Sequence, residues 1–328
     1  MNNPLDQIRL RDLMLLEHVQ TLGTLREASI ALHVTQPAVT QMLKGLERAF
    51  GVALVERGRR GVRLTDAGQA ALVRLRCARH EIEFARDAAL SSLQPMLRVG
   101  ATPIATLQLL PRAVSRMRTQ LPGVRLTLTE TGVESLWRQL SEGTLDALVG
   151  RLPGLNPQYP QLNGLRYEVV GTERMVLVGS KSHPMAQAVP RSRSTAQWLK
   201  ALSASHWVLP PSDALAVLSF NEWFGQAGLM PPVPTVVSGS FYASLNMVAK
   251  SELLAVVPES AALGLLGTLK LKILETPWRN PPVNIVFAAR ESNWDTEAVA
   301  ALRMCFAALQ ATPRPLVNRT GQAARQKM

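Results

Sequence analysis

The sequence contains only two cysteines among 328 residues, Cys77 and Cys305. Both lie in segments with helical patterns far apart in the chain, so we expect reduced thiols and no disulfide framework. No apolar run approaches the roughly 18 residues that a membrane-spanning helix needs. The first residues, MNNPLDQIRLRDL, also lack the apolar core typical of a signal peptide. These absences predict a soluble, cytoplasmic protein with no membrane partner.

Sequence motifs of common enzymes are missing as well. There is no GxSxG, GxGxxG or phosphate-loop motif. The five histidines show no spacing suited to metal ligation: His18, His33, His80, His183 and His206. The sequence therefore predicts no catalytic residue, no metal site and no cofactor. An enzymatic α/β protein remains an alternative, because much of the chain alternates strands with helices.

Acidic residues are outnumbered, and the formal net charge of +12 indicates a polyanionic partner. The excess is spread along the chain. Residues 1–94 hold 13 cationic and 10 anionic side chains, residues 95–311 hold 19 and 14, and residues 312–328 hold 4 and none. Total charge therefore identifies no single domain as the DNA-binding one. Local clusters of Lys and Arg are more informative.

The first fifty residues predict three helices. Residues 8–22 and 25–32 have helical apolar spacing, with Gly23 as a break and Thr24 as a cap. Thr35 caps a third helix, whose first turn holds Pro37, where a missing N–H costs nothing. That helix ends at Gly51, and its buried face is predicted to comprise Val39, Met42, Leu43, Leu46 and Phe50.

The other face of the third helix is polar and mildly basic. It carries Gln36, Thr40, Gln41, Lys44 and Arg48. Amide, hydroxyl and cationic groups at the start of a helix suit base edges and phosphates in a major groove. This pattern predicts the recognition helix of a helix-turn-helix.

A two-stranded wing is predicted after Gly51. Apolar residues alternate with polar ones from position 53 to position 64, around Gly58 and Gly61. Arg59 and Arg60 at its tip could reach phosphate or a minor groove. The alternative is a solvated basic hairpin that touches nothing, but the neighbouring helix-turn-helix favours DNA.

A long helix is predicted over residues 67–93, capped by Thr65 or Asp66. Its apolar residues follow a heptad spacing from position 71 to position 89. We expect this seam to pair two copies of the chain, with contacts from Leu75, Ala78, Ile82 and Ala85. Alternatively, the seam packs on its own domain.

Residues 95–311 alternate strands and helices, which predicts an α/β fold with a cleft between two lobes. The expected first lobe comprises 95–166 and 274–311, and the second comprises 167–273. Residues 312–328 lack apolar periodicity, so we expect a disordered basic tail. The full division is then 1–65 for the DNA-binding domain, 66–94 for the linker, 95–311 for the two lobes and 312–328 for the tail.

The stretches LREASIALHVTQPAVTQMLKGLE and LVERGRRGVRLTDAGQAAL resemble the winged helix-turn-helix of LysR-type transcriptional regulators. The resemblance implies a linker helix followed by a two-lobed domain similar to periplasmic binding proteins, which holds a small co-inducer. It also implies double-stranded promoter DNA and further copies of the chain, as a dimer of dimers, as partners. RNA polymerase is a further candidate partner. The stretch NMVAKSELLAVVPES resembles the branch of regulators that respond to sugars and aromatic acids.

The resemblance assigns DNA contacts to the start of the third helix and to Arg60 of the wing. The helix residues are Thr35, Gln36, Pro37, Thr40 and Gln41, to which the polar face adds Lys44 and the wing adds Arg59. Many relatives carry Arg or Lys at the position of Gln41. Because glutamine prefers adenine whereas arginine prefers guanine, we expect an adenine at that step.

Helix starts predict the ligand site in the cleft. Thr102 and Pro103 follow the first strand of the lobes, and Thr131, followed by Gly132, has Glu134 as a capping-box partner. The other expected site residues are Arg151, Ser212, Ser240 and Phe241. Converging helix starts suit a carboxylate or a hydroxyl-rich sugar. For each residue the alternative is an ordinary structural cap.

Three other classes of protein share parts of these features. Another kind of winged-helix regulator would share the N-terminal part but lack the linker and the two lobes. A solute-binding protein or an enzyme would share the lobes but would not need residues 1–94. The sequence thus predicts a DNA-binding regulator controlled by a small organic molecule.

Overall fold

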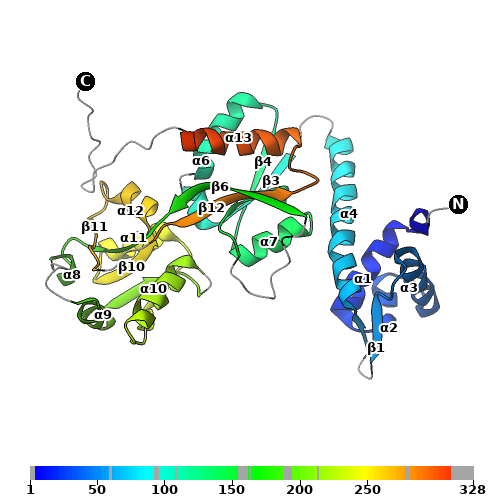
Figure 1. Cartoon of the computed structure of the whole chain (residues 1–328), viewed down its shortest axis with the longest axis horizontal. Coiled ribbons are helices and arrows are strands. Elements are labelled where there is room, and N and C mark those ends of the chain that lie inside the picture. Colours follow the sequence, from blue (N-terminus) through cyan, green and yellow to red (C-terminus); the bar gives the residue numbers. More distant parts are fainter. Residues whose placement is uncertain are drawn as a thin grey trace.

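The computed structural model describes residues 4–58, 61–91, 96–107, 109–153, 162, 164–187, 194–212, 214–277 and 281–311. Figure 1 shows a small N-terminal head, a long helix and two α/β lobes arranged along the molecule. The long helix stands between the head and the first lobe. No helix among the described residues is both long enough and apolar enough to span a bilayer.

The head is a winged helix-turn-helix, as predicted. It contains η1 (Pro4–Gln7), α1 (Leu10–Leu22), α2 (Leu25–Ala31), α3 (Gln36–Phe50), β1 (Val55–Gly58) and β2 (Gly61–Leu64). Gly23 ends α1 with a φ of 73°, a left-handed conformation that glycine adopts without strain. The Thr24 hydroxyl then accepts a hydrogen bond from the Glu27 N–H and so caps α2. The strands β1 and β2 pair antiparallel and form the wing.

The predicted buried face of α3 is largely confirmed. Val39, Leu43 and Leu46 are buried in the core of the head, where they pack with α1 and α2. Met42 is partly buried against this core. Phe50 is an exception, because its side chain is 38% exposed at the last position of the helix.

The linker helix is α4 (Asp66–Ser91), capped by the Thr65 hydroxyl, which accepts a hydrogen bond from the Gly68 N–H at 3.0 Å. Its predicted seam is divided. Leu75 is buried in the core of the head, so its own chain already covers it. Ala78, Ile82 and Ala85 lie about one to three turns further on and are exposed.

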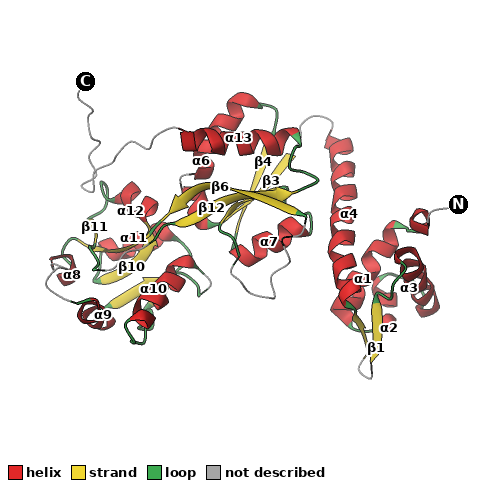
Figure 2. Ribbon diagram, in the orientation of Figure 1, coloured by secondary structure: helices red, strands yellow, loops and turns green. Residues whose placement is uncertain are grey.

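The first lobe is a five-stranded mixed sheet in the order β4-β3-β5-β12-β6. Figure 2 shows helices on both faces. Helices α6 and α13 cover one face, and α7 covers the other through Leu136, Trp137 and Leu140. The elements are β3 (Met96–Ala101), α5 (Pro103–Leu107), α6 (Leu109–Gln120), β4 (Arg125–Glu130), α7 (Val133–Ser141), β5 (Ala147–Gly150), β6 (Leu165–Glu173), β12 (Val283–Arg290) and α13 (Glu297–Ala311).

The second lobe has its own five-stranded sheet, in the order β11-β7-β10-β8-β9. Three fully buried aromatic side chains, Trp198, Trp207 and Phe220, anchor one face of this sheet. The elements are β7 (Met175–Ser180), α8 (Pro184–Gln187), α9 (Thr195–Ser203), β8 (His206–Leu209), α10 (Leu215–Gln226), β9 (Val236–Val237), α11 (Phe241–Ala249), β10 (Leu253–Pro258), α12 (Glu259–Leu265) and β11 (Leu271–Ile273).

The predicted boundary between the lobes at residue 166 is wrong. Strand β6 pairs antiparallel with β12 from Leu165 to Glu173, so these residues belong to the sheet of the first lobe. The chain crosses into the second lobe only where β7 begins. Glu173 marks the crossing, because its carboxylate accepts hydrogen bonds from the Arg174 and Ser260 N–H groups. The predicted tail, residues 312–328, lies outside the described residues.

Candidate functional site

The outer surface of α3 is open to solvent. Thr35, Gln36, Pro37, Gln41 and Lys44 are exposed, and Thr40 is half-buried. Thr35 caps the helix as predicted, because its hydroxyl accepts a hydrogen bond from the Ala38 N–H at 3.4 Å. The amide groups of Gln36 and Gln41 are thus presented by a helix whose start is fixed by its own chain, as base readout requires.

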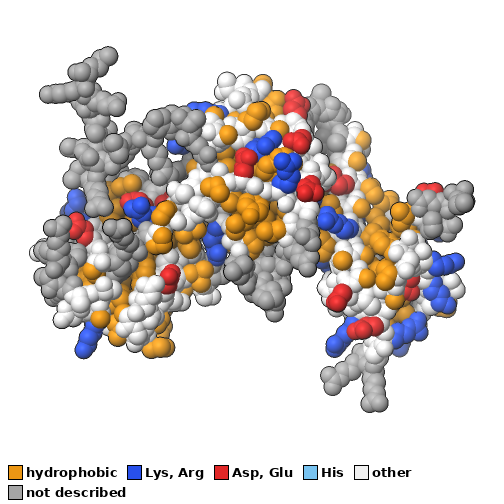
Figure 3. Space-filling view, viewed as in Figure 1, with side chains coloured by type: hydrophobic (Ala, Val, Ile, Leu, Met, Phe, Trp, Pro, Cys, Tyr) orange, Lys and Arg blue, Asp and Glu red, His pale blue; other side chains and the backbone are white. Residues whose placement is uncertain are grey.

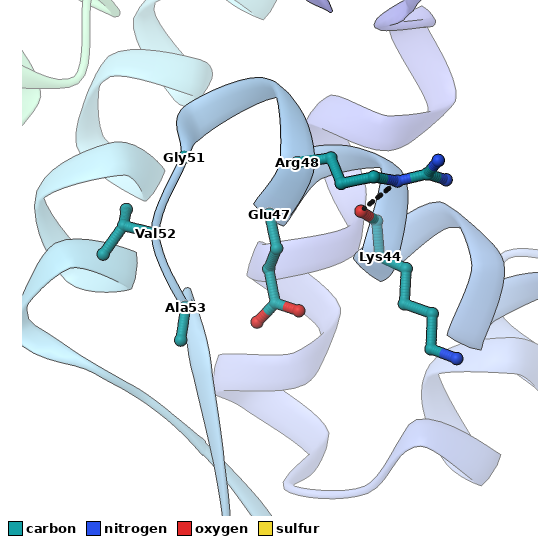
Figure 4. Close-up of a pocket in the computed structure, with 6 residues that line it drawn as sticks. All are labelled: Lys44, Glu47, Arg48, Gly51, Val52 and Ala53. Atoms are coloured by element: carbon teal, nitrogen blue, oxygen red, sulfur yellow. Dashed lines mark hydrogen bonds between the residues drawn. The ribbon is translucent and has the colours of Figure 1, made fainter.

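Hydrogen bonds hold several polar side chains of α3 close to the helix. The Thr40 hydroxyl donates to the Gln36 carbonyl at 3.1 Å, and Arg48 Nε donates to the Lys44 carbonyl at 3.3 Å. Figure 4 shows a shallow hollow at the end of α3, lined in part by Lys44 and Arg48. There the Glu47 carboxylate accepts the Leu54 N–H at 3.0 Å, which ties α3 to the start of the wing.

The wing packs closely on the turn between α1 and α2. The Val62 N–H donates to the Gly23 carbonyl at 2.8 Å. Gly61 has a φ of 124°, and a Cβ there would lie 2.3 Å from the Gly23 oxygen, so no larger residue fits. The predicted contacts Arg59 and Arg60 lie outside the described residues. Figure 3 shows other Lys and Arg side chains along the outer edge of the head.

A cleft of about 310 Å³ lies between the two lobes. The first lobe lines it with Thr102, Pro103, Ile104, Glu130, Thr131, Gly132, Val133, Arg151 and Ile285. The second lobe lines it with Pro210, Pro211, Ala214, Leu215, Ala216, Gly239 and Phe241. Every described lining residue from the second lobe is apolar, whereas the first lobe supplies hydroxyl and charged groups.

Two helices begin at the cleft without a side-chain cap. Gly132 is the N-cap of α7 and Ala214 is the N-cap of α10, and neither can supply a capping side chain. Thr131 was predicted to cap α7 in a capping box with Glu134, which is wrong because the helix starts one residue later. The first N–H groups of α7 and α10 lack intrahelical acceptors, and the helix dipoles make both ends favourable for an anion.

The Thr102 hydroxyl has no partner among the described residues, although Thr102 is only 6% exposed. It was predicted to cap the following helix, and that prediction is wrong. The backbone of Thr102 is held by its N–H, which donates to the Val149 carbonyl at 3.0 Å. A buried hydroxyl without a partner costs free energy, and a ligand in the cleft could remove that cost.

Charged groups of both signs lie on the first-lobe side. Glu130 is at the end of β4, and its carboxylate accepts a hydrogen bond from the Thr106 hydroxyl at 2.6 Å. Arg151 follows β5, and its carbonyl accepts the Trp137 Nε1–H at 3.0 Å, which fixes the backbone at that point. Arg151 was predicted as a site residue from sequence, whereas Glu130 was missed.

Two sequence models match the chain on either side of the linker. Residues 10–69 match the bacterial regulatory helix-turn-helix protein, lysR family, and residues 91–310 match the LysR substrate binding domain. The second match alone covers well over half of the chain. The chain belongs to the LysR family of transcriptional regulators.

Individual LysR-family proteins support this assignment. The transcriptional regulator GalR of Pseudomonas putida is 31% identical over 245 residues, which are 73% of this chain and 59% of GalR. PcaQ of Agrobacterium fabrum is 34% identical over 187 residues, 55% of this chain and 57% of PcaQ. The chain thus spans less than two thirds of the length of these relatives.

Solved structures show the same fold. Full-length LysG of Corynebacterium glutamicum, solved with its bound effector Arg, has a TM-score of 0.60 at 20% identity. The match covers 94% of this chain and 100% of LysG. A full-length OxyR variant of Pseudomonas aeruginosa has a TM-score of 0.55 at 20% identity, and that match covers 92% of this chain and 98% of OxyR.

The site of this LysR-family chain differs from the prediction mainly in the second lobe. Ser212 and Ser240 do not line the cleft. Ser212 is exposed, and the Ser240 hydroxyl accepts the Ala243 N–H as an ordinary cap of α11. Phe241 lines the cleft as predicted. The sequence feature that could have indicated the other lining residues of the second lobe is the Pro210-Pro211 turn, which directly follows a buried strand.

Proposed function

We propose that this chain binds promoter DNA through α3 and the wing, and that a small carboxylate with an apolar body modulates this binding from the cleft. The observation that carries the DNA role is the exposed polar face of α3, which presents Gln36 and Gln41 on a helix fixed at its start by Thr35. Regulation rather than catalysis is the role that this arrangement supports.

The carboxylate is supported by the two sides of the cleft. Donors to an anion are the uncapped N–H groups at the starts of α7 and α10 and the Thr102 hydroxyl, which has no partner among the described residues. The described wall of the second lobe offers only apolar side chains such as Leu215 and Phe241. A sugar would leave hydroxyl groups without partners against that wall, which costs free energy. A carboxylate therefore fits better than a hydroxyl-rich ligand.

A second copy of the chain is the proposed partner of α4. Ile82 is 45% exposed and lies between the exposed Ala78 and Ala85 on one face of the helix. Two such faces would bury each other's apolar side chains. Pairing would place two copies of α3 on one DNA site, and two pairs would give the expected dimer of dimers. RNA polymerase is proposed as a further partner of the DNA-bound assembly.

Selection from a library of genomic DNA fragments tests the DNA role. The full chain should enrich a small set of fragments. Gln36→Ala should weaken binding to these fragments but not to random DNA. Arg60→Ala should lower affinity evenly across sequences and reduce the dependence on salt, because it removes a phosphate contact. A chain that enriches no fragment would contradict the proposal.

Thermal denaturation of the full chain tests the ligand class. Isocaproate should raise the melting temperature, because it combines a carboxylate with an apolar body of suitable size. Isocaproamide has the same body without the charge and serves as the matched control, and galactose represents the sugars. A shift with galactose and none with any carboxylate would contradict the proposed class.

A further inference from the structure

One face of α4 is packed against the first lobe. Cys77, Glu81 and Phe84 follow one another at helical spacing and all contact that lobe. Cys77 faces Gly143, where an added Cβ would lie 3.0 Å from the Cys77 sulfur. Gly143 also has a φ of 83°, so only glycine suits this close approach. This face is distinct from the exposed seam that contains Ile82.

Arg290 joins this face of α4 to the end of α7. Its side chain is only 3% exposed. Nη1 donates to the Leu140 carbonyl at 3.1 Å and to the Leu145 carbonyl at 2.6 Å. Nη2 donates to the Glu81 carboxylate at 2.8 Å. The guanidinium therefore links the carboxyl-terminal end of α7 directly to the linker helix. A cation at that end of α7 interacts favourably with its helix dipole.

Arg76 extends the connection to the head. Nη1 lies 2.7 Å from the Glu142 carboxylate, just past α7, and Nε lies 3.2 Å from the Glu17 carboxylate on α1. His80 also bonds to the Glu142 carbonyl, with 2.8 Å between Nδ1 and the oxygen. Arg76 thus contacts both the head and the first lobe.

Helix α7 reaches from the cleft to this junction. Gly132 and Val133 line the cleft at its start, and Glu142 contacts α4 at its other end. Nine residues span about 14 Å. Leu136, Trp137 and Leu140 are almost fully buried against the sheet, so α7 is a rigid element. Figure 1 shows α7 along one face of the first-lobe sheet, on the side of the lobe that is nearer to α4.

We propose that α7 transmits occupancy of the cleft to the head, through Glu142–Arg76 and through Arg290–Glu81. The inference rests on the proposed function, because it needs an anion at the start of α7. Arg76 has two acidic partners, so it can lose Glu142 and keep Glu17 without becoming unpaired. A junction that can keep one ion pair after losing another has a second arrangement available, which is what a switch requires.

Hydrogen–deuterium exchange of the full chain tests this coupling without DNA. Gly132→Asp would place a fixed carboxylate at the start of α7, as a bound anion does, and Gly132→Asn is the neutral control. Gly132 has φ −66° and ψ 157°, which any residue can adopt. Amides of residues 74–84 should exchange about fivefold more slowly in Gly132→Asp than in Gly132→Asn. In the Glu81→Gln/Glu142→Gln background, in which both proposed connections to α4 are weakened, this difference should disappear.

Unchanged exchange at residues 74–84 in Gly132→Asp would overturn the coupling, as would a difference that persists in the Glu81→Gln/Glu142→Gln background. Saturating isocaproate on the natural chain gives a second measurement that depends on no variant at α7. A thermal shift with isocaproate but unchanged exchange at 74–84 would overturn the coupling and leave the proposed ligand class standing. Slower exchange in Gly132→Asp without any shift from carboxylates would support the coupling and overturn that ligand class.

Discussion

Thr35 in the head and Thr102 in the cleft have similar sequence contexts. Each directly precedes a helix that has a proline in its first turn. The Thr35 hydroxyl accepts the Ala38 N–H and is exposed. The Thr102 hydroxyl is buried and has no partner in the described part of the chain. The different hydrogen bonding of the two hydroxyls distinguishes a DNA-binding surface from a ligand-binding cleft. A DNA-binding surface benefits from groups that are already held in place, whereas a ligand cleft benefits from groups that still lack a partner.

Other helix starts show the same contrast, apart from α11 at the cleft, which the Ser240 side chain caps. In the head, Thr24 and Thr35 cap α2 and α3 with their side chains. At the cleft, Gly132 and Ala214 begin α7 and α10 without a side-chain cap. The starts of α2 and α3 are thus satisfied by their own side chains, whereas the starts of α7 and α10 keep hydrogen-bond donors available at the cleft.

The largest effect is expected for a substitution on the DNA-binding face of α3. Gln41→Arg should change the preferred base at one step of the site from adenine to guanine. The change in discrimination should be about tenfold to a hundredfold, as for one bidentate base contact. Binding-site selection measures it, with Gln226→Arg as a control that adds the same charge on the exposed face of α10. Unchanged preference at every base would contradict the assigned contact.

Thr102→Val tests the open hydroxyl in the cleft. The substitution keeps the shape of the side chain and should weaken binding of the carboxylate about tenfold, because one hydrogen bond to a charged group is lost. Without ligand, the free energy of unfolding should stay the same or rise by up to about 1 kcal/mol, since an unpaired buried hydroxyl is removed. Calorimetric titration and urea unfolding measure the two effects. Thr119→Val, on the exposed face of α6, serves as the control.

Thr35→Val should have the opposite effect on stability. Loss of the cap should lower the free energy of unfolding by about 1 kcal/mol. Thr40→Val is the matched control on the same helix, because its hydroxyl only bonds back to the Gln36 carbonyl. Urea unfolding should show a clear loss for position 35 and little change for position 40. Equal effects of Thr35→Val and Thr102→Val would remove the contrast between the two sites.

The smallest effect concerns pH and the second lobe. Burial lowers the pKa of His183 below its usual value, and the nearby Glu252 opposes this shift only in part. The lowered pKa favours the neutral form in the folded state, in which Nδ1 accepts the Met185 N–H. The unfolded state binds the His183 proton more tightly than the folded state. The contribution of His183 to stability is therefore fully present above pH ~6.5 and is lost as the pH falls below that value.

His183→Asn keeps a hydrogen-bond acceptor near the position of Nδ1 but cannot be protonated. Thermal denaturation should show that the variant loses less stability than the natural chain between pH 7.5 and pH 5. The difference between the two losses should equal the contribution of a single titrating group. Identical pH profiles of the two proteins would show that His183 does not contribute.

Local patterns predicted the head well, because its contacts are close in sequence. The spacing of Val39, Leu43 and Leu46 fixed the buried face of α3, whereas Phe50 was misjudged because the helix ends there in solvent. The cleft was less predictable. Its second-lobe wall comes from turns and from the first residues of α10 and α11, where no sequence periodicity indicates a cleft, so hydroxyl residues such as Ser212 were chosen instead.

The junction at the linker could not be predicted at all. Arg290 and Glu81 are 209 positions apart, and neither charge has a sequence neighbour that indicates its partner. The course of β6 was missed for a related reason. Its pairing with β12, more than a hundred residues later, determines which lobe it joins.

Nuclease footprinting of a selected DNA fragment tests the central claim most directly. The natural chain is measured with and without the carboxylate that gives the largest thermal shift, and Thr102→Val is measured in parallel. We predict that the carboxylate changes the length or the hypersensitive positions of the footprint for the natural chain, because the angle between paired α3 helices changes. Thr102→Val should need about tenfold more carboxylate for the same change. Identical footprints with and without the bound carboxylate would contradict it.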